Sequence, residues 1–317
     1  MRQFILALAF LACFLPEFKL YAQADLSMAT HWYNRANYNP ASIVRTDYIY
    51  LFSNVRQQWL GVVGAPKVIN LQGSEYVNDI HSAFGISLAG EKIGATQAYN
   101  PMVTYAYRLS NNQSWSLAMG LSLGIFTRFI NNTLLVAETS SDPSLNREIE
   151  KITRPDANVG LEFQTKYFIG SISSTHILSV NKTDLSFLNT THYYGSVIYK
   201  NSNFELFNYH IGLQVVNQSN LTVLESNLNI RFKRPTGLQS GPREIFDLGF
   251  TYRTSQEMIL LIAFNVTSYL RIGYAFGQSF NIGYDANGTH ELMLEYRIPS
   301  KAASTRGQFE NQEYWYH

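Results

Sequence analysis

The feature that most constrains this chain is the strict alternation of apolar and small or polar side chains along short segments. The clearest segment runs from Ser114 to Ile125. A strand would place alternate residues on opposite faces, whereas a helix would scatter both sets around its circumference. The large apolar set of this segment consists of Trp115, Leu117, Met119, Leu121, Leu123 and Ile125. We therefore expect strands with one fully apolar face.

About fourteen segments of this kind follow one another along the chain. Some connections between them are tight and polar, as at 110–113, whereas others are long, about 128–155 and 175–190. Short turns on one side, long loops on the other and segments of about ten residues are typical of a transmembrane antiparallel β-barrel. The segments lie near 46–58, 66–76, 83–91, 97–109, 114–127, 156–164, 167–174, 191–199, 204–216, 221–233, 244–253, 257–266, 268–276 and 289–298.

Composition favours the same all-β fold class. Charged residues make up 15% of the chain, against roughly 25% in soluble domains. Aromatic residues make up 14%, yet the mean hydropathy is only −0.12, as expected when apolar and polar strand faces average out. The alternative is a secreted β-sandwich or a non-membrane barrel, which would need two large sheets or two domains, and no Pro/Gly/Ser-rich linker divides the chain. A net charge of +1 argues against a nucleic-acid-binding protein.

The N-terminus has the pattern of a signal peptide. A positive start at Arg2 precedes an apolar run too short to span a membrane as a helix, and small residues offer cleavage after Ala22 or Ala24. We expect a signal peptide at 1–22, a barrel at 25–298 and a flexible periplasmic tail at 299–317. The single cysteine, Cys13, is either an inert part of the signal peptide or a lipidated first residue.

Charged side chains alternate with apolar ones in two of the last strands. Their positions predict a polar interior that contains Asp247, Arg253, Glu291, Glu295 and Arg297. The segment around Gly120 adds only Ser, Ala and Gly to that interior, which leaves space. An even strand number would place both termini on the periplasmic side of a bacterial outer membrane.

Motifs for catalysis or cofactor binding are absent from the sequence. It has no nucleophile elbow, dinucleotide-binding turn, phosphate-binding loop or paired-histidine zinc motif, and its seven histidines are widely separated. His176 near Ser173 and Ser174 offers only a weak candidate for a serine–histidine pair. We expect no enzyme activity, no cofactor and no metal.

A set of short strings follows one another along the chain. They are Trp32-Tyr33-Asn34, Asn39-Pro40-Ala41, Arg56-Gln57-Gln58-Trp59-Leu60-Gly61, Gly64-Ala65-Pro66-Lys67, Gly85-Ile86-Ser87-Leu88, Glu91-Lys92-Ile93-Gly94, Tyr105-Ala106-Tyr107-Arg108-Leu109, Leu270-Arg271-Ile272-Gly273-Tyr274-Ala275-Phe276 and His290-Glu291-Leu292-Met293-Leu294. In sequence, order and spacing, from about residue 28 to 298, these strings resemble the PorP/SprF family of outer-membrane proteins, which serves type IX secretion and gliding in the Bacteroidota. Two features depart from the family: the chain continues to His317, and the connection at 234–243 is longer than the family's usual turn.

The resemblance implies an outer-membrane component that supports secretion or surface attachment of cargo or adhesins bearing a C-terminal type IX signal. Its implied partners are the lipid, the periplasmic and outer-membrane parts of the machine, and the cargo itself. The family-motif positions have either a structural role or a partner-contact role. They are Asn39, Pro40, Arg56, Gln58, Trp59, Gly61, Pro66, Lys92 and Gly94.

Two function classes remain open at this point. A fourteen-stranded barrel has a narrower lumen than a sixteen-stranded porin, too narrow for a folded adhesin domain, which favours an interaction component. The alternative is a small-solute channel or a transporter of hydrophobic substrates. The tail offers a candidate partner contact in Tyr314, Trp315 and Tyr316, because aromatic side chains often anchor interfaces.

Overall fold

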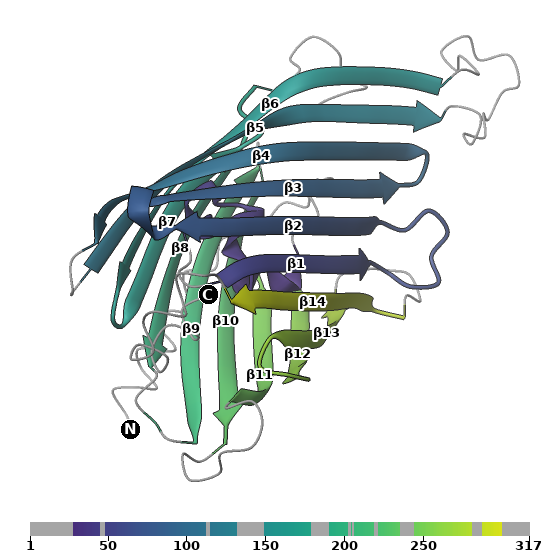
Figure 1. Ribbon diagram of the computed structural model, residues 1–317. Coiled ribbons are helices and arrows are strands. Elements are labelled where there is room, and N and C mark those ends of the chain that lie inside the picture. The colour runs from purple at the N-terminus through teal and green to yellow at the C-terminus, as the bar shows by residue number, and fades with distance from the viewer. Residues whose placement is uncertain are drawn as a thin grey trace, which may run out of the picture.

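The computed structural model is a closed barrel of fourteen antiparallel strands, each hydrogen-bonded to the next, with β1 paired to β14 (Figure 1). It describes residues 28–44, 48–111, 115–131, 149–178, 190–201, 204, 206–218, 221–234, 244–280 and 287–299. The strands are β1 (Tyr48–Gln57), β2 (Lys67–Val77), β3 (Ser82–Ile93), β4 (Thr96–Asn111), β5 (Trp115–Asn131), β6 (Ile149–Thr165), β7 (Phe168–Thr175), β8 (His192–Asn201), β9 (Phe207–Gln218), β10 (Leu221–Lys233), β11 (Glu244–Arg253), β12 (Glu257–Asn265), β13 (Leu270–Ser279) and β14 (Thr289–Pro299).

All fourteen predicted segments are strands, so the predicted fold class is confirmed. The main error concerns the long connection expected at about 128–155. Residues up to Asn131 belong to β5, and β6 already begins at Ile149, because the two strands pair over 17 residues each. Charged residues and Pro155 along this part of β6 had hidden the strand from the alternation pattern.

The alternation along each strand separates a lipid-facing wall from a polar interior. Leu260 and Ile86 are 62% and 66% exposed on the outside, whereas Asp247 is 0% exposed inside. On β5 the outer residues Met119, Leu121 and Leu123 are exposed as predicted. In the described part of the chain, no helix has the length and apolar character needed to cross a membrane.

The two mouths of the barrel differ. Odd-numbered strands run towards one end, called here the loop mouth, where residues 58–66, 254–256 and 287–288 connect strands. Even-numbered strands run back to the turn mouth, where β1 begins and β14 ends, with short connections at 166–167 and 266–269. The tail beyond Pro299 and the signal-peptide region lie outside the described residues.

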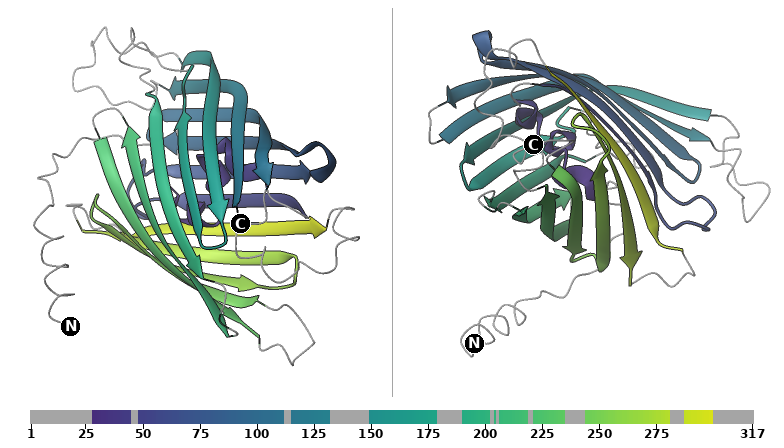
Figure 2. Two further views of the ribbon diagram at one scale, coloured as in Figure 1. Left: turned by 90° about the vertical axis from the view of Figure 1, so that its left-hand side faces the viewer. Right: turned by 60° about the horizontal axis from the view of Figure 1, so that its bottom comes forward.

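Four short 3₁₀ helices complete the described structure. One, η4 (Asn78–Ile80), forms the turn between β2 and β3. The other three are η1 (Ala29–Trp32), η2 (Arg35–Asn37) and η3 (Pro40–Ile43), and together they lie inside the barrel (Figure 2). Residues 28–44, called here the plug, are almost entirely buried.

Candidate functional site

The plug crosses the lumen from the loop mouth to the turn mouth. At its start, the carbonyl of Met28 accepts a hydrogen bond of 3.1 Å from Arg253, the last residue of β11. The amides of Ala29 and Thr30 donate to Glu291, near the first residue of β14, at 2.8 and 3.0 Å. Because odd strands end and even strands begin at the loop mouth, Met28 lies at the end opposite to the start of β1. The start of β1 and the end of β14 both lie at the turn mouth. The termini themselves lie outside the described residues, so their periplasmic placement stays a prediction.

Glu291 anchors the end of the plug that lies at the loop mouth. Besides the two amides, it accepts from the Thr30 hydroxyl and from Asn54 Nδ2. Arg56, a family-motif position, lies 3.7 Å from Glu291 and donates to Glu257 at 3.0 Å. The Arg56 side chain is 3% exposed, so it acts inside the barrel and does not form part of the surface loop.

The middle of the plug is fixed by Trp32. Its indole nitrogen donates to Glu225 on β10, and His31 Nε2 lies 3.0 Å from the same carboxylate. The ring fills the space at Gly212 on β9, where any Cβ would overlap it, and it packs on Ile169 and Ile198. An aromatic side chain with a buried, hydrogen-bonded N–H is a strong determinant of position.

Glu162, near the end of β6, holds the part of the plug that lies towards the turn mouth. Arg35 donates to this carboxylate through two nitrogens, both at 3.0 Å, and Ser42 donates to it at 2.5 Å. Bidentate arginine–carboxylate pairs of this kind contain some of the strongest hydrogen bonds in proteins. Burial opposes the charge on Arg35, but the adjacent Glu162 outweighs this effect and raises the pKa of Arg35.

The Asn39-Pro40 motif has a physical explanation in this segment. Asn39 Oδ1 accepts from the amide of Ala41 at 3.0 Å and so caps η3, while Pro40 occupies the first helical position, where its missing N–H costs nothing. Asn39 Nδ2 also donates to the carbonyl of Leu161 at 3.0 Å. Asn39 is 0% exposed and Pro40 is buried, so both of these predicted site residues lie inside the barrel.

Glycines of the barrel wall provide the space for the plug. A Cβ on Gly120 would clash with the backbone of Pro40 and Ala41, and a Cβ on Gly160 would clash with Asn39. The space that the sequence predicted around Gly120 is therefore real, but it is filled by the chain's own N-terminal segment. The residues that anchor this segment, Arg35, Glu162 and Glu225, were missed in the sequence, where only the wall glycines pointed to an occupant.

A second set of buried charges lines the wall of β10 to β14. The predicted inward positions of Asp247, Arg253, Glu291, Glu295 and Arg297 are all confirmed, each at most 6% exposed. Arg231 donates to Asp247 at 2.8 Å and to Glu244 at 3.1 Å. Arg271 links Glu244, at 2.7 Å, to Glu295, at 3.5 Å. Arg231 of β10 thus pairs with the neighbouring β11, and Arg271 of β13 pairs with the neighbouring β14 and with β11 two strands away. Such pairing is the condition for burying these charges.

Tyr33 connects the plug to this charged wall. Its hydroxyl accepts from Asn229 Nδ2 at 2.6 Å. The ring lies over the Arg271 guanidinium at 5.8 Å.

The remaining family-motif positions lie at the loop mouth, in residues 58–66 and at the turn after β3. Residues 58–66, called here the motif loop, are joined to the neighbouring loops by Leu60 N–H to Gly288 O, at 2.9 Å, and Gly94 N–H to Gly64 O, at 2.9 Å. Gln58 N–H donates to Pro66 O at 2.9 Å and closes the loop. Trp59, Gly61 and Gly94 have positive φ values of 47°, 97° and 56°, a conformation that favours glycine.

The motif loop presents apolar side chains outwards. Val63 is 100% exposed and Leu60 is 44% exposed. Lys92 is exposed near the end of β3, and its neighbour Glu91 lies 3.8 Å from Arg128 of β5. The motif positions thus lie in two places. Asn39, Pro40 and Arg56 are buried in or beside the plug, whereas the others lie at the loop mouth, where Pro66 is buried, Gln58 and Trp59 are half-buried, and Gly61, Lys92 and Gly94 are exposed. The candidate contact residues Tyr314, Trp315 and Tyr316 lie outside the described residues.

His176 does not form the weak serine pair considered above. Its Nδ1 lies 2.7 Å from Asp156 Oδ2, which also accepts from Asn100 at 2.6 Å. Within the described ranges no group of three or more metal-ligating side chains is present.

The fold and the filled lumen define an outer-membrane β-barrel with an N-terminal plug. A family model described as the type IX secretion system membrane protein PorP/SprF matches residues 20–296. The chain therefore belongs to the PorP/SprF family, as the sequence motifs indicated. No curated protein matches the chain.

Solved structures of similar fold include three channels or transporters. The CymD monoaromatic hydrocarbon channel has 11% identity over 89% of this chain and 95% of its own, with a TM-score of 0.51. The toluene transporter TodX of P. putida has 8% identity over 84% and 94%, with a TM-score of 0.52. The Ralstonia pickettii toluene transporter TbuX has 9% identity over 82% and 92%, with a TM-score of 0.51. At these identities the likeness shows the fold alone, and neither the family description nor these titles names a catalytic activity.

Proposed function

We propose that this protein supports secretion or surface attachment of type IX cargo or adhesins through protein–protein contacts. The observation that carries the proposal is the plug, which crosses the lumen and is held by buried carboxylates on three separate strands, β6, β10 and β14. A lumen occupied in this way is unsuited to conducting solutes or a polypeptide. The family match supplies the secretion context.

In this proposal the loop mouth faces the cell exterior and the turn mouth faces the periplasm. Short periplasmic turns and longer external loops are the usual arrangement of such barrels. The motif loop, with Leu60 and Val63 exposed, would then contact cargo or an outer partner. The tail after Pro299 would extend from the turn mouth towards periplasmic components of the machine.

The motif loop is tested by placing a charge on its apex. Val63→Asp is compared with Val266→Asp, because Val266 is also exposed, at 56%, but lies at the turn mouth. In cells, Val63→Asp is expected to leave heat-modifiable barrel in the outer membrane and to reduce cargo at the surface, measured with antibody on intact cells. Equal display of cargo by both variants and the parent would contradict a contact at this loop.

The tail is tested by deleting residues 304–317. A periplasmic contact segment predicts a normally inserted barrel that loses a periplasmic partner in pull-downs or loses cargo display. If the shortened barrel inserts and retains both, Tyr314, Trp315 and Tyr316 are not contact residues.

Single-channel conductance distinguishes the proposed function from the alternative, a solute channel or a transporter of hydrophobic substrates. In planar bilayers the intact protein is expected to remain closed. Steady single-channel conductance of the intact protein, or uptake of a hydrophobic solute that depends on it, would favour the alternative.

A further inference from the structure

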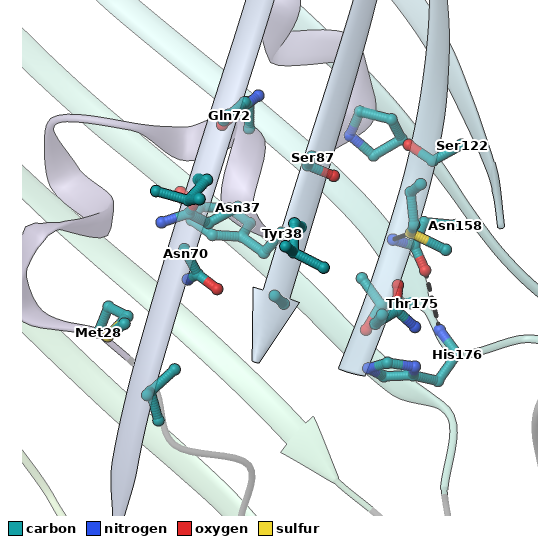
Figure 3. A pocket seen from close by; sticks show the side chains of 18 of the residues that line it. Met28, Asn37, Tyr38, Asn70, Gln72, Ser87, Ser122, Asn158, Thr175 and His176 are labelled. Atoms are coloured by element: carbon teal, nitrogen blue, oxygen red, sulfur yellow. Dashed lines mark hydrogen bonds between the residues drawn. The ribbon is translucent and has the colours of Figure 1, made fainter. Parts of the chain in front are cut away.

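The plug does not fill the loop-side half of the lumen completely. A cavity of about 180 Å³ remains between η2 and the wall of β2 to β9. Figure 3 shows Asn37 and Tyr38 of the plug on the side of Asn70 and Gln72, and Asn158, Thr175 and His176 across the space. At roughly 30 Å³ per water, this volume holds about six waters or one small organic molecule.

The lining of the cavity has a distinctive chemistry. Among the described residues that line it, none is Lys or Arg, and the only carboxylate is that of Glu91. Primary amides both donate and accept hydrogen bonds, as hydroxyl groups do, whereas anions need donors only and cations acceptors only. The amide side chains of the lining are Asn37, Asn70, Gln72, Asn100, Asn158 and Gln214.

Two of these amides have a nitrogen without a hydrogen-bond partner in the described structure. Gln214 is 2% exposed, and its Nε2 is buried and unpaired. Asn37 accepts from Asn34 through its oxygen at 3.2 Å, but its buried Nδ2 is likewise unpaired. Buried donors are costly to leave unsatisfied, so an acceptor in the cavity, either water or a ligand oxygen, would stabilise these two amides.

The walls around these amides are held in place. Tyr38 stacks on Tyr194 with ring centroids 5.2 Å apart, and Phe126 meets the edge of His176 at 5.5 Å. His176 is fixed by Asp156 at 2.7 Å, and its amide donates to Asn158 Oδ1 at 3.0 Å. Aromatic surfaces combined with a few oriented polar groups are usual in sites for small molecules.

We propose that this cavity binds a neutral, polyhydroxylated molecule of monosaccharide size, whose oxygens accept from Gln214 Nε2 and Asn37 Nδ2. The volume sets the size, the amides match hydroxyl groups, and the lack of lysine and arginine disfavours an anion. The site is separate from the motif loop and does not depend on the proposed role in secretion.

The test uses the purified full-length protein in nanodiscs with hexoses and gluconate as probes, followed by calorimetry or saturation-transfer NMR. Gln214→Leu removes the amide whose Nε2 is unpaired and keeps the volume of the side chain nearly constant. Gln278→Leu is the matched control, because Gln278 is exposed and does not line the cavity. Purified lipopolysaccharide as a further probe distinguishes the glycan of a membrane surface from a free sugar.

We expect at least one neutral hexose, free or as part of the glycan, to bind and gluconate to bind much more weakly. Gln214→Leu should weaken hexose binding about tenfold while raising the melting temperature of the unliganded barrel, since an unpaired buried donor is removed. Gln278→Leu should change neither. Absence of any hexose or glycan binding, with only water in the cavity, would overturn the proposal, as would unchanged affinity in Gln214→Leu.

Discussion

At the scale of single residues, packing of the interior requires glycine at positions of the barrel wall that contact the plug. Gly160 faces the plug, and a methyl group there would clash with the Asn39 side chain that caps η3. Gly170 lies on the next strand, where a methyl group would meet nothing within 4 Å. Gly170 therefore serves as the control position for a substitution at Gly160.

Gly160→Ala is expected to displace Asn39 and destabilise the protein by about 1–3 kcal/mol, the usual cost of overfilling a packed site. Gly170→Ala should change stability by less than about 0.5 kcal/mol. Urea unfolding of both variants in lipid vesicles measures the difference. Equal stabilities would mean that Asn39 does not occupy the space at Gly160.

The pair of Arg35 and Glu162 carries a second prediction at this scale. Glu162→Ala leaves the Arg35 charge buried without its carboxylate and should cost about 3–5 kcal/mol. The double variant Arg35→Met, Glu162→Leu should recover most of this loss, because two matched apolar side chains replace both charges. As a control, Glu91→Ala should cost at most about 1 kcal/mol, since its pair with Arg128 is partly exposed. The double-mutant cycle is completed by the single variants Arg35→Met and Glu162→Leu, and additive losses in that cycle would contradict a direct interaction.

At the scale of elements, the strands could be predicted and the plug could not. The strands follow a local rule, because a lipid-facing wall and a polar interior impose the same alternation on every segment. The plug follows no such period. Its three helices have three or four residues each, and Trp32, Arg35 and Ala29 find their partners 193, 127 and 262 residues away. Contacts at that separation leave no pattern in the local sequence.

The lipid-facing side of β5 carries a prediction at this scale. Met119→Arg should cost about 2–4 kcal/mol if the residue lies near the membrane midplane. Gln278→Arg, at the exposed end of β13, should cost much less because it lies near the loop mouth. The fraction of heat-modifiable barrel in urea titrations measures both. A smaller loss for Met119→Arg than for Gln278→Arg would mean that the membrane-facing surface has been misassigned.

The structure changes the expectation for the inner side of β5. The sequence alone predicts open space in the interior around Gly120. Gly120 in fact lies against the backbone of Pro40 and Ala41, so an arginine there must displace the plug. The exposed motif loop was likewise visible in the sequence as a string, but its separation from the buried motif positions became clear only from the fold.

At the scale of the whole molecule, the central claim is that the chain closes its own barrel. The lumen is crossed by residues 28–44, whose first residues reach the loop mouth while β14 ends at the turn mouth. This arrangement leaves partner contacts to the two mouths and the membrane-facing wall.

The most direct measurement is thiol cross-linking between plug and wall in native outer membranes. The only cysteine of the chain is Cys13, so a Cys13→Ser background contains no other thiol. Asn54 Nδ2 donates to Thr30 Oγ1 at 2.7 Å, so Thr30→Cys with Asn54→Cys should be joined by a short bifunctional thiol reagent, detected as a cross-linked peptide by mass spectrometry. Thr30→Cys with Val55→Cys is the control, because Val55 is 47% exposed on the outer face of the same strand. Efficient cross-linking of the first pair alone is the predicted result, and equal or absent cross-linking of the two pairs would contradict a plug inside the barrel.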